Sequence, residues 1–120
     1  MKTNKKYFEQ LRARIKKRSN DIDQLRLQNE SVKKQIIHKL MEDSGTDFPE
    51  KAEQMLELLL HTDHAIDVLR HDFSEFTLSG NWINIEKEAE SCIGALQKIE
   101  TAIFQTAKLL DDVQASVARQ

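Results

Sequence analysis

The sequence has little of what interrupts helices or cross-links small folds. It contains three glycines, one proline and one cysteine in 120 residues. These counts exclude a collagen-like chain, a disulfide-bonded scaffold and a linker rich in proline and glycine. No apolar run approaches the roughly 18 residues that a membrane-spanning helix needs, and no apolar segment follows the basic start as in a secretory signal. We therefore expect no membrane contact and no cleaved leader.

The sequence also lacks the motifs of common enzymes. It has no glycine-rich phosphate loop, and its single cysteine, Cys92, has no histidine near it in the chain. Cys92 falls on an apolar helical stripe, where a cysteine packs as a small core residue. We expect no catalysis and no cofactor. A lone cysteine cannot form an internal disulfide, which favours a reducing, cytoplasmic environment.

What is abundant is Glu, Lys, Leu, Gln and Ala, the residues that favour long helices. Two breaks divide the chain, at residues 43–49 and 77–81. Gly45 suits the position after a helix, Pro49 the first turn of the next, and Ser79 or Asn81 the cap of the last. The pattern predicts one all-α domain over residues 1–120. Its fold would be an up-down-up antiparallel bundle, with an extended coiled-coil first helix, of segments 4–43, 50–76 and 82–118.

The first segment reads as heptads whose two apolar rows alternate in steps of three and four. Asn29, between isoleucines, is typical of the asparagine that fixes register in two-stranded coiled coils, but also fits a partly exposed position on a bundle helix. Arg18 and Lys39 weaken the seam. Near its end the stripe widens enough for burial against two neighbours. The rows are Phe8, Ile15, Ile22, Asn29 and Ile36, and Leu11, Arg18, Leu25, Val32 and Lys39; the widening comprises Ile36, Ile37, Leu40 and Met41.

The other two segments carry equally clear stripes. Gly94 interrupts the third segment and suggests a close approach of another helix. In the second segment, Leu56, Leu60 and Val68 fall off the main stripe, so this helix is apolar on more than one side. The stripes are Met55, Leu59, Thr62, Ile66, Leu69, Phe73 and Phe76, and Trp82, Ile85, Ala89, Cys92, Leu96, Ile99, Ile103, Thr106, Leu110, Val113 and Val117.

Helices of about 60, 40 and 55 Å cannot match all their ends in one bundle. The longest would expose an apolar row in water, which monomers avoid. We therefore expect a protein-protein interaction module: an adaptor, a chaperone-like binder or a subunit of a coiled-coil assembly, either as a homo-oligomer or in a hetero-complex. The expected contact residues are Ile15, Ile22, Leu25 and Asn29 on one surface, Leu56, Leu60 and Val68 on another, and Trp82, which could instead close the end of the bundle.

Charge is unevenly spread. Residues 1–39 hold 12 Lys or Arg against 4 Asp or Glu, a net charge of +8, and residues 40–120 carry −10. A basic arm before heptads has the layout of a basic-zipper DNA binder, so a nucleic-acid-associated regulator is the alternative function. The apolar heptads already run through the basic stretch, however, and an acidic remainder repels phosphate.

One polar segment has the composition of a metal site. His64, Asp67 and His71 share one helix face, and His61 is close to His64, so imidazole and carboxylate groups could hold a divalent ion such as zinc. These residues lie away from the apolar stripe, and no second helix supplies a further ligand. A solvated polar face is the favoured interpretation, and we assign no metal ligand.

Overall fold

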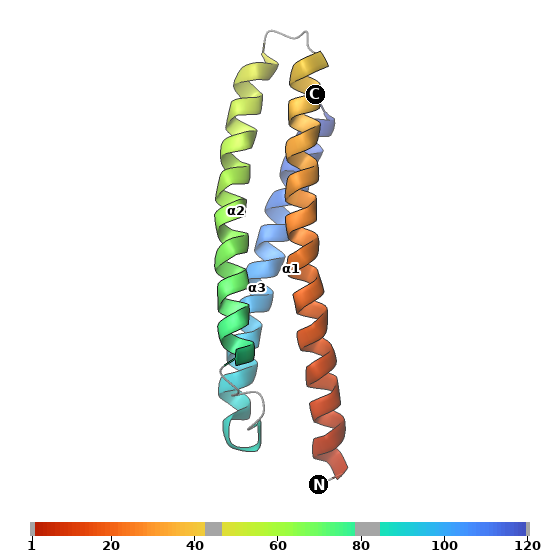
Figure 1. The fold of residues 1–120 in the computed structure, drawn as a ribbon, viewed down its shortest axis with the longest axis vertical. Helices are drawn as coiled ribbons and strands as arrows, with labels where there is room; N and C mark the ends of the chain where they lie inside the picture. The colour runs from red at the N-terminus through yellow and green to blue at the C-terminus, as the bar shows by residue number, and fades with distance from the viewer. Residues whose placement is uncertain (1, 43–46, 79–84, 120) are drawn as a thin grey trace.

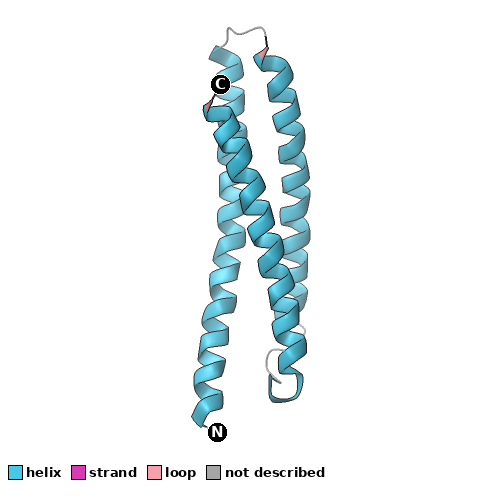
Figure 2. Cartoon of the chain, turned by 180° about the vertical axis from the view of Figure 1, so that it is seen from behind, coloured by secondary structure: helices cyan, strands magenta, loops and turns pink. Residues whose placement is uncertain are grey.

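A computed structural model describes residues 2–42, 47–78 and 85–119. Its three helices are α1, Lys2–Glu42, α2, Phe48–Leu78, and α3, Ile85–Ala118. Each helix packs against the other two (Figures 1 and 2). α2 runs opposite to α1 and α3, and those ranges contain no strand. The predicted all-α, up-down-up bundle is confirmed.

The helix ends lie within a few residues of the predicted ones. Pro49 occupies the first turn of α2, as expected, because its missing N–H costs nothing there. Asp47 precedes this helix and its carbonyl accepts a hydrogen bond from the Lys51 N–H at 3.3 Å. The predicted caps Ser79 and Asn81 and the predicted helix start at Trp82 lie outside the described residues. α1 continues without a break through 19–21.

The core is one apolar cluster to which all three helices contribute. The stripe predicted for the second helix is buried except for the half-buried Phe73, and the third stripe is buried from Leu96 onward. Earlier stripe residues, Cys92 included, lie outside the described side chains. Fully buried side chains from each helix line the long axis of this cluster, among them Val32, Ile36, Leu59, Ile66, Leu96 and Leu110.

The apolar row of α1 is covered within the chain from Leu11 to Leu25. Leu11, Ile22 and Leu25 are at most 4% exposed, and Ile15 packs half-buried against the same core. Leu11, Ile22 and Leu25 therefore need no second chain to cover them, because α2 and α3 together fill the groove along this part of α1. The bundle measures 66 × 20 × 16 Å, and the first turns of α1 extend beyond the end of α2 (Figure 1).

The wider part of the apolar stripe near the end of α1 is only partly buried, contrary to prediction. Ile36 is fully buried and Leu40 is half-buried, but Ile37 is 50% and Met41 81% exposed. The physical reason is that two neighbours cover a helix over one arc. Ile37 and Met41 project beyond that arc, on the side of α2.

A buried polar network joins α1 to α2. Asn29 is fully buried; its Nδ2 donates to Asp63 Oδ1, and its Oδ1 lies 2.6 Å from the Thr62 hydroxyl, which can donate to it. Lys33 Nζ donates to Asp63 Oδ2, and this hydrogen bond raises the pKa of Lys33. Asn29 thus fixes register between two helices of one chain. It neither pairs with a second coiled-coil strand nor lies partly exposed.

The two cations predicted to weaken the α1 seam instead bond to neighbouring helices. Lys39 Nζ donates to the Val117 carbonyl at 3.1 Å, at the end of α3, and lies 5.7 Å from the centre of the Phe48 ring. A cation at a helix C-terminus is favourable because the last carbonyls lack helical partners. Arg18 binds Glu100 of α3, as described below.

We predict that Asn29→Ala lowers the free energy of unfolding by about 2–3 kcal/mol, because it empties a fully buried site and removes the hydrogen bonds that Asn29 makes with Thr62 and Asp63. Urea denaturation measures this loss. The matched control is Asn20→Ala, an exposed asparagine of the same helix, which we expect to change stability by less than about 0.5 kcal/mol. Equal effects for both variants would contradict the assignment.

Gly94 does not mark a close helix approach. A Cβ added to it would meet no atom within 4 Å, so the predicted tight contact is wrong. We predict that Gly94→Ala raises the free energy of unfolding by about 0.5–1 kcal/mol, through helix propensity alone. Thermal unfolding tests this, with Ala95→Gly at an exposed neighbouring position expected to cause a similar loss. If Gly94→Ala instead lowered the free energy of unfolding, the result would contradict the open space that the structure shows beside Gly94.

Candidate docking site

Four apolar side chains line the boundary between α1 and α2 on the outside of the bundle. On α1, Ile37 and Met41 follow Lys33 at one-turn intervals, so they continue along the side that reaches Asp63 of α2. On α2, Leu60 and Leu56 precede Asp63 by one and two turns and continue along the side facing α1. We call Ile37, Met41, Leu56 and Leu60 the α1/α2 outer face.

Cross-helix ion pairs fix the register at this boundary. Besides the Lys33–Asp63 pair, Arg26 Nη2 donates to Asp67 Oδ1 at 2.5 Å and Arg70 Nη2 to Asp23 Oδ1 at 2.8 Å. Residue numbers that rise along α1 therefore lie beside residue numbers that fall along α2. This antiparallel register places Ile37 level with residues 56–60, so apolar groups from both helices meet on one surface.

The α1/α2 outer face is mostly uncovered. Leu60 is 64% exposed and Leu56 is half-buried. Isolated exposed apolar residues are ordinary on protein surfaces, whereas a contiguous group marks an interaction site. On the flanks of this face lie exposed charges, Lys34 on α1 and Glu57 on α2.

The eight predicted contact residues divide into three groups. Ile22, Leu25 and Asn29 lie inside the bundle and Ile15 is half-buried against the core, so the folded chain does not present them as a continuous surface. Leu56, Leu60 and Val68 lie off the buried stripe, as the sequence predicted, with Val68 44% exposed. Trp82 lies outside the described residues. Sequence reasoning assigned Ile37 and Met41 to the core and so missed them as surface groups.

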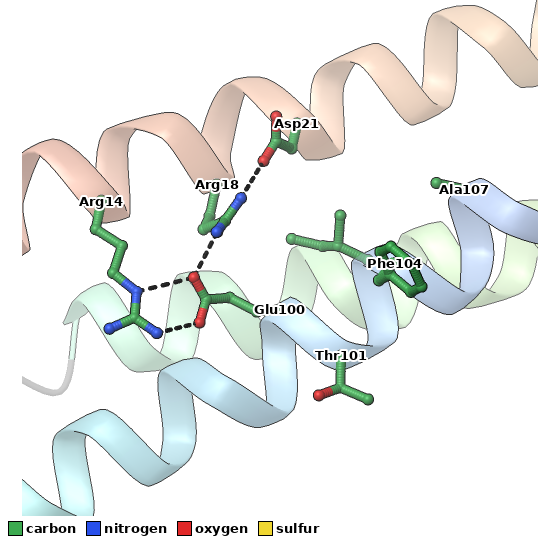
Figure 3. Close-up of a pocket in the computed structure, with 8 residues that line it drawn as sticks. Arg14, Arg18, Asp21, Glu100, Thr101, Phe104 and Ala107 are labelled. Carbon is green, nitrogen blue, oxygen red and sulfur yellow. Dashed lines mark hydrogen bonds and ion pairs between the residues drawn. The ribbon is translucent and has the colours of Figure 1, made fainter.

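The basic stretch of α1 is partly neutralised by α3. The Glu100 carboxylate accepts hydrogen bonds from Arg14 and Arg18 (Figure 3). Arg14 donates through Nη2 and through Nε at 2.9 Å, and Arg18 donates through Nε at 2.6 Å. Arg18 also pairs with Asp21 at 2.8 Å. The hydrogen bond from Arg14, followed by that from Arg18, lowers the pKa of Glu100 to about 2. The hydrogen bonds that Arg18 donates to Asp21 and Glu100 raise the pKa of Arg18.

An open groove between α1 and α3 surrounds this ion-pair cluster. Its lining includes Ile103, Thr101 and Phe104, and the Phe104 ring is 73% exposed (Figure 3). In this groove Phe104 lies among charged groups, which include Arg18 and Glu100. Nothing in its spacing distinguished it from other residues beside the third stripe.

The histidine-rich segment of α2 lies on the surface. His61, His64 and His71 are all exposed. Within residues 2–42, 47–78 and 85–119 no three His, Cys, Asp or Glu side chains are placed to hold a metal ion. Over the same part of the chain, no helix combines the length and apolar character needed to cross a bilayer.

Comparison with known proteins adds no relative. The chain matches no protein-family model, no curated protein and no solved structure. Any function must therefore be argued from the surfaces described above.

We predict that Glu100→Gln lowers the free energy of unfolding by about 2 kcal/mol at pH 7, because two arginines lose their carboxylate. The pKa of Glu100 is lowered in the folded state, so its contribution is complete above about pH 5 and is lost as the pH falls toward 2. Urea titrations at several pH values should show the wild type and Glu100→Gln converging in acid.

The control for that experiment is Glu75→Gln, an exposed carboxylate of α2. We expect it to follow the wild-type pH profile. A gap between wild type and Glu100→Gln that stays constant from pH 7 to pH 2 would show that the Glu100 charge does not stabilise the fold.

Proposed function

We propose that this protein is a non-catalytic interaction module that docks an apolar surface of a partner onto the α1/α2 outer face. The observation that carries the proposal is the contrast between a well-filled core and the exposed side chains of Ile37, Met41 and Leu60, which are 50%, 81% and 64% exposed. Three helices have enough apolar surface to fill their own core, and these residues remain outside it on one boundary.

Burial of apolar area supplies the binding energy, at about 25 cal/mol per Å². The flanking charges Lys34 and Glu57 steer the approach and set orientation more than they add affinity. Such a module acts as a helical adaptor, a chaperone-like binder or a subunit of a larger helical assembly. We place it in a reducing compartment such as the cytoplasm, because its single Cys92 cannot form an internal disulfide.

A nucleic-acid-associated role has weaker support. The basic stretch of α1 does present Lys6, Lys16 and Lys17 to solvent. However, Arg14 and Arg18 bind Glu100, and a cation already paired with a carboxylate contributes little to phosphate binding. We therefore retain protein docking as the function.

We predict that Leu60→Asp abolishes partner retention, because it removes apolar contact and introduces a charge that the complex would have to desolvate. The measurement is retention of partner proteins from cell extract by the immobilised chain, quantified against wild type, with a loss of at least about 30-fold expected from a cost above 2 kcal/mol.

The control is Phe104→Asp, which places the same charge at an exposed apolar residue on the α1/α3 side. We expect it to retain partners as the wild type does. Both positions are exposed, so circular dichroism should show both variants folded. Equal retention by Leu60→Asp and wild type would refute docking on this face.

A further inference from the structure

We propose that the α1/α2 outer face binds a second copy of the same chain, in a symmetric dimer whose two-fold axis runs parallel to the helices. This inference rests on the proposed docking function and names its partner. It follows from the distribution of charge and apolar groups on the two helices that form the face.

The geometry of such an axis is simple. A two-fold rotation about a line parallel to the helices, within the interface, keeps every residue at its own height along the bundle. It places α1 of one copy over α2 of the other. Residues of α1 and α2 that share a height therefore face each other across the interface. The ion pairs Lys33–Asp63, Arg26–Asp67 and Arg70–Asp23 give those heights.

Apolar groups then oppose apolar groups. Ile37 lies level with Leu56 and Leu60, so the same residues meet twice around the axis. The dimer thus covers Ile37, Met41 and Leu60, three of the exposed large apolar residues of α1 and α2.

Charged groups are complementary in the same arrangement. Lys34 of one copy comes within about one helical turn of Glu57 of the other, and symmetry forms this contact twice. Both side chains are exposed in the single chain. Opposite charges at matching heights favour this pairing.

The other two-fold arrangement is disfavoured by charge. An axis perpendicular to the helices would place α2 against α2 of the second copy. Centred on the apolar groups, it would set Glu53 and Glu57 of one copy against the same two residues of the other. Like charges across an interface cost binding energy and select against that orientation. The parallel axis instead brings Glu57 of each copy near Lys34 of the other.

A charge-exchange experiment tests the parallel dimer. We expect sedimentation equilibrium to give the mass of a dimer for the wild type. Lys34→Glu and Glu57→Lys, each alone, create two like-charge contacts and should each weaken the dimer by about tenfold. An equimolar mixture of the two variants forms mixed dimers in which both contacts again join opposite charges, so wild-type affinity should return. The double variant K34E/E57K should also dimerise like the wild type.

Several results would overturn the second-copy assignment: a wild type that stays monomeric up to millimolar concentration, single variants that dimerise unchanged, or a mixture that does not recover. Circular dichroism confirms that each variant is folded, since Lys34 and Glu57 are exposed. A monomeric wild type whose partner retention still depends on Leu60 would refute the dimer and leave the docking function standing. A monomeric wild type whose partner retention does not depend on Leu60 would refute both the dimer and the docking function.

Discussion

The buried polar contact between α1 and α2 is the constraint on which the rest of the surface depends. Asn29 and Thr62 are buried and hydrogen-bonded to each other, and Asp63 and Lys33, which are partly exposed, close the network at its edge. Sliding α1 along α2 by one turn would leave the Asn29 amide unpaired among apolar side chains, at a cost of several kcal/mol. Apolar packing alone discriminates poorly between such shifts, so the polar groups select one register.

That register determines which apolar residues stay outside. With Asn29 beside Thr62, the next turns of α1 bring Ile37 and Met41 alongside Leu60 and Leu56. The sequence carries these side chains on two separate helices, and only the alignment of the helices makes them one surface. The proposed docking face is therefore a consequence of the register that the buried polar groups select. On this proposal, a substitution inside the bundle alters binding without changing a residue of the face.

The uneven charge of the chain has a structural role. The basic α1 meets acidic groups on both neighbours: Arg14 and Arg18 at Glu100 of α3, and Arg26 at Asp67 of α2. Pairs that are exposed contribute little stability each, but together they orient α1 between two acidic helices. The positive charge of residues 1–39 is thus partly complemented within the chain.

The sequence predicted the helices and the buried stripes well, because a repeat of three and four residues defines one face without knowledge of the neighbours. It also identified Leu56 and Leu60 as lying off the stripe. It misplaced Ile37 and Met41, because periodicity does not reveal how wide an arc two neighbouring helices cover. It could not assign partners to Asn29 or Glu100, since those lie more than 30 and 80 residues away in the chain.

The most direct test of this arrangement is an NMR measurement on the Asn29 side-chain amide. In uniformly labelled protein diluted with unlabelled protein, we expect its two protons to exchange slowly with water. We also expect nuclear Overhauser effects from them to Thr62 of the same chain, whereas the Asn20 amide exchanges fast. Rapid exchange at Asn29, or contacts to Thr62 that arise only between chains, would contradict a register fixed inside the single bundle.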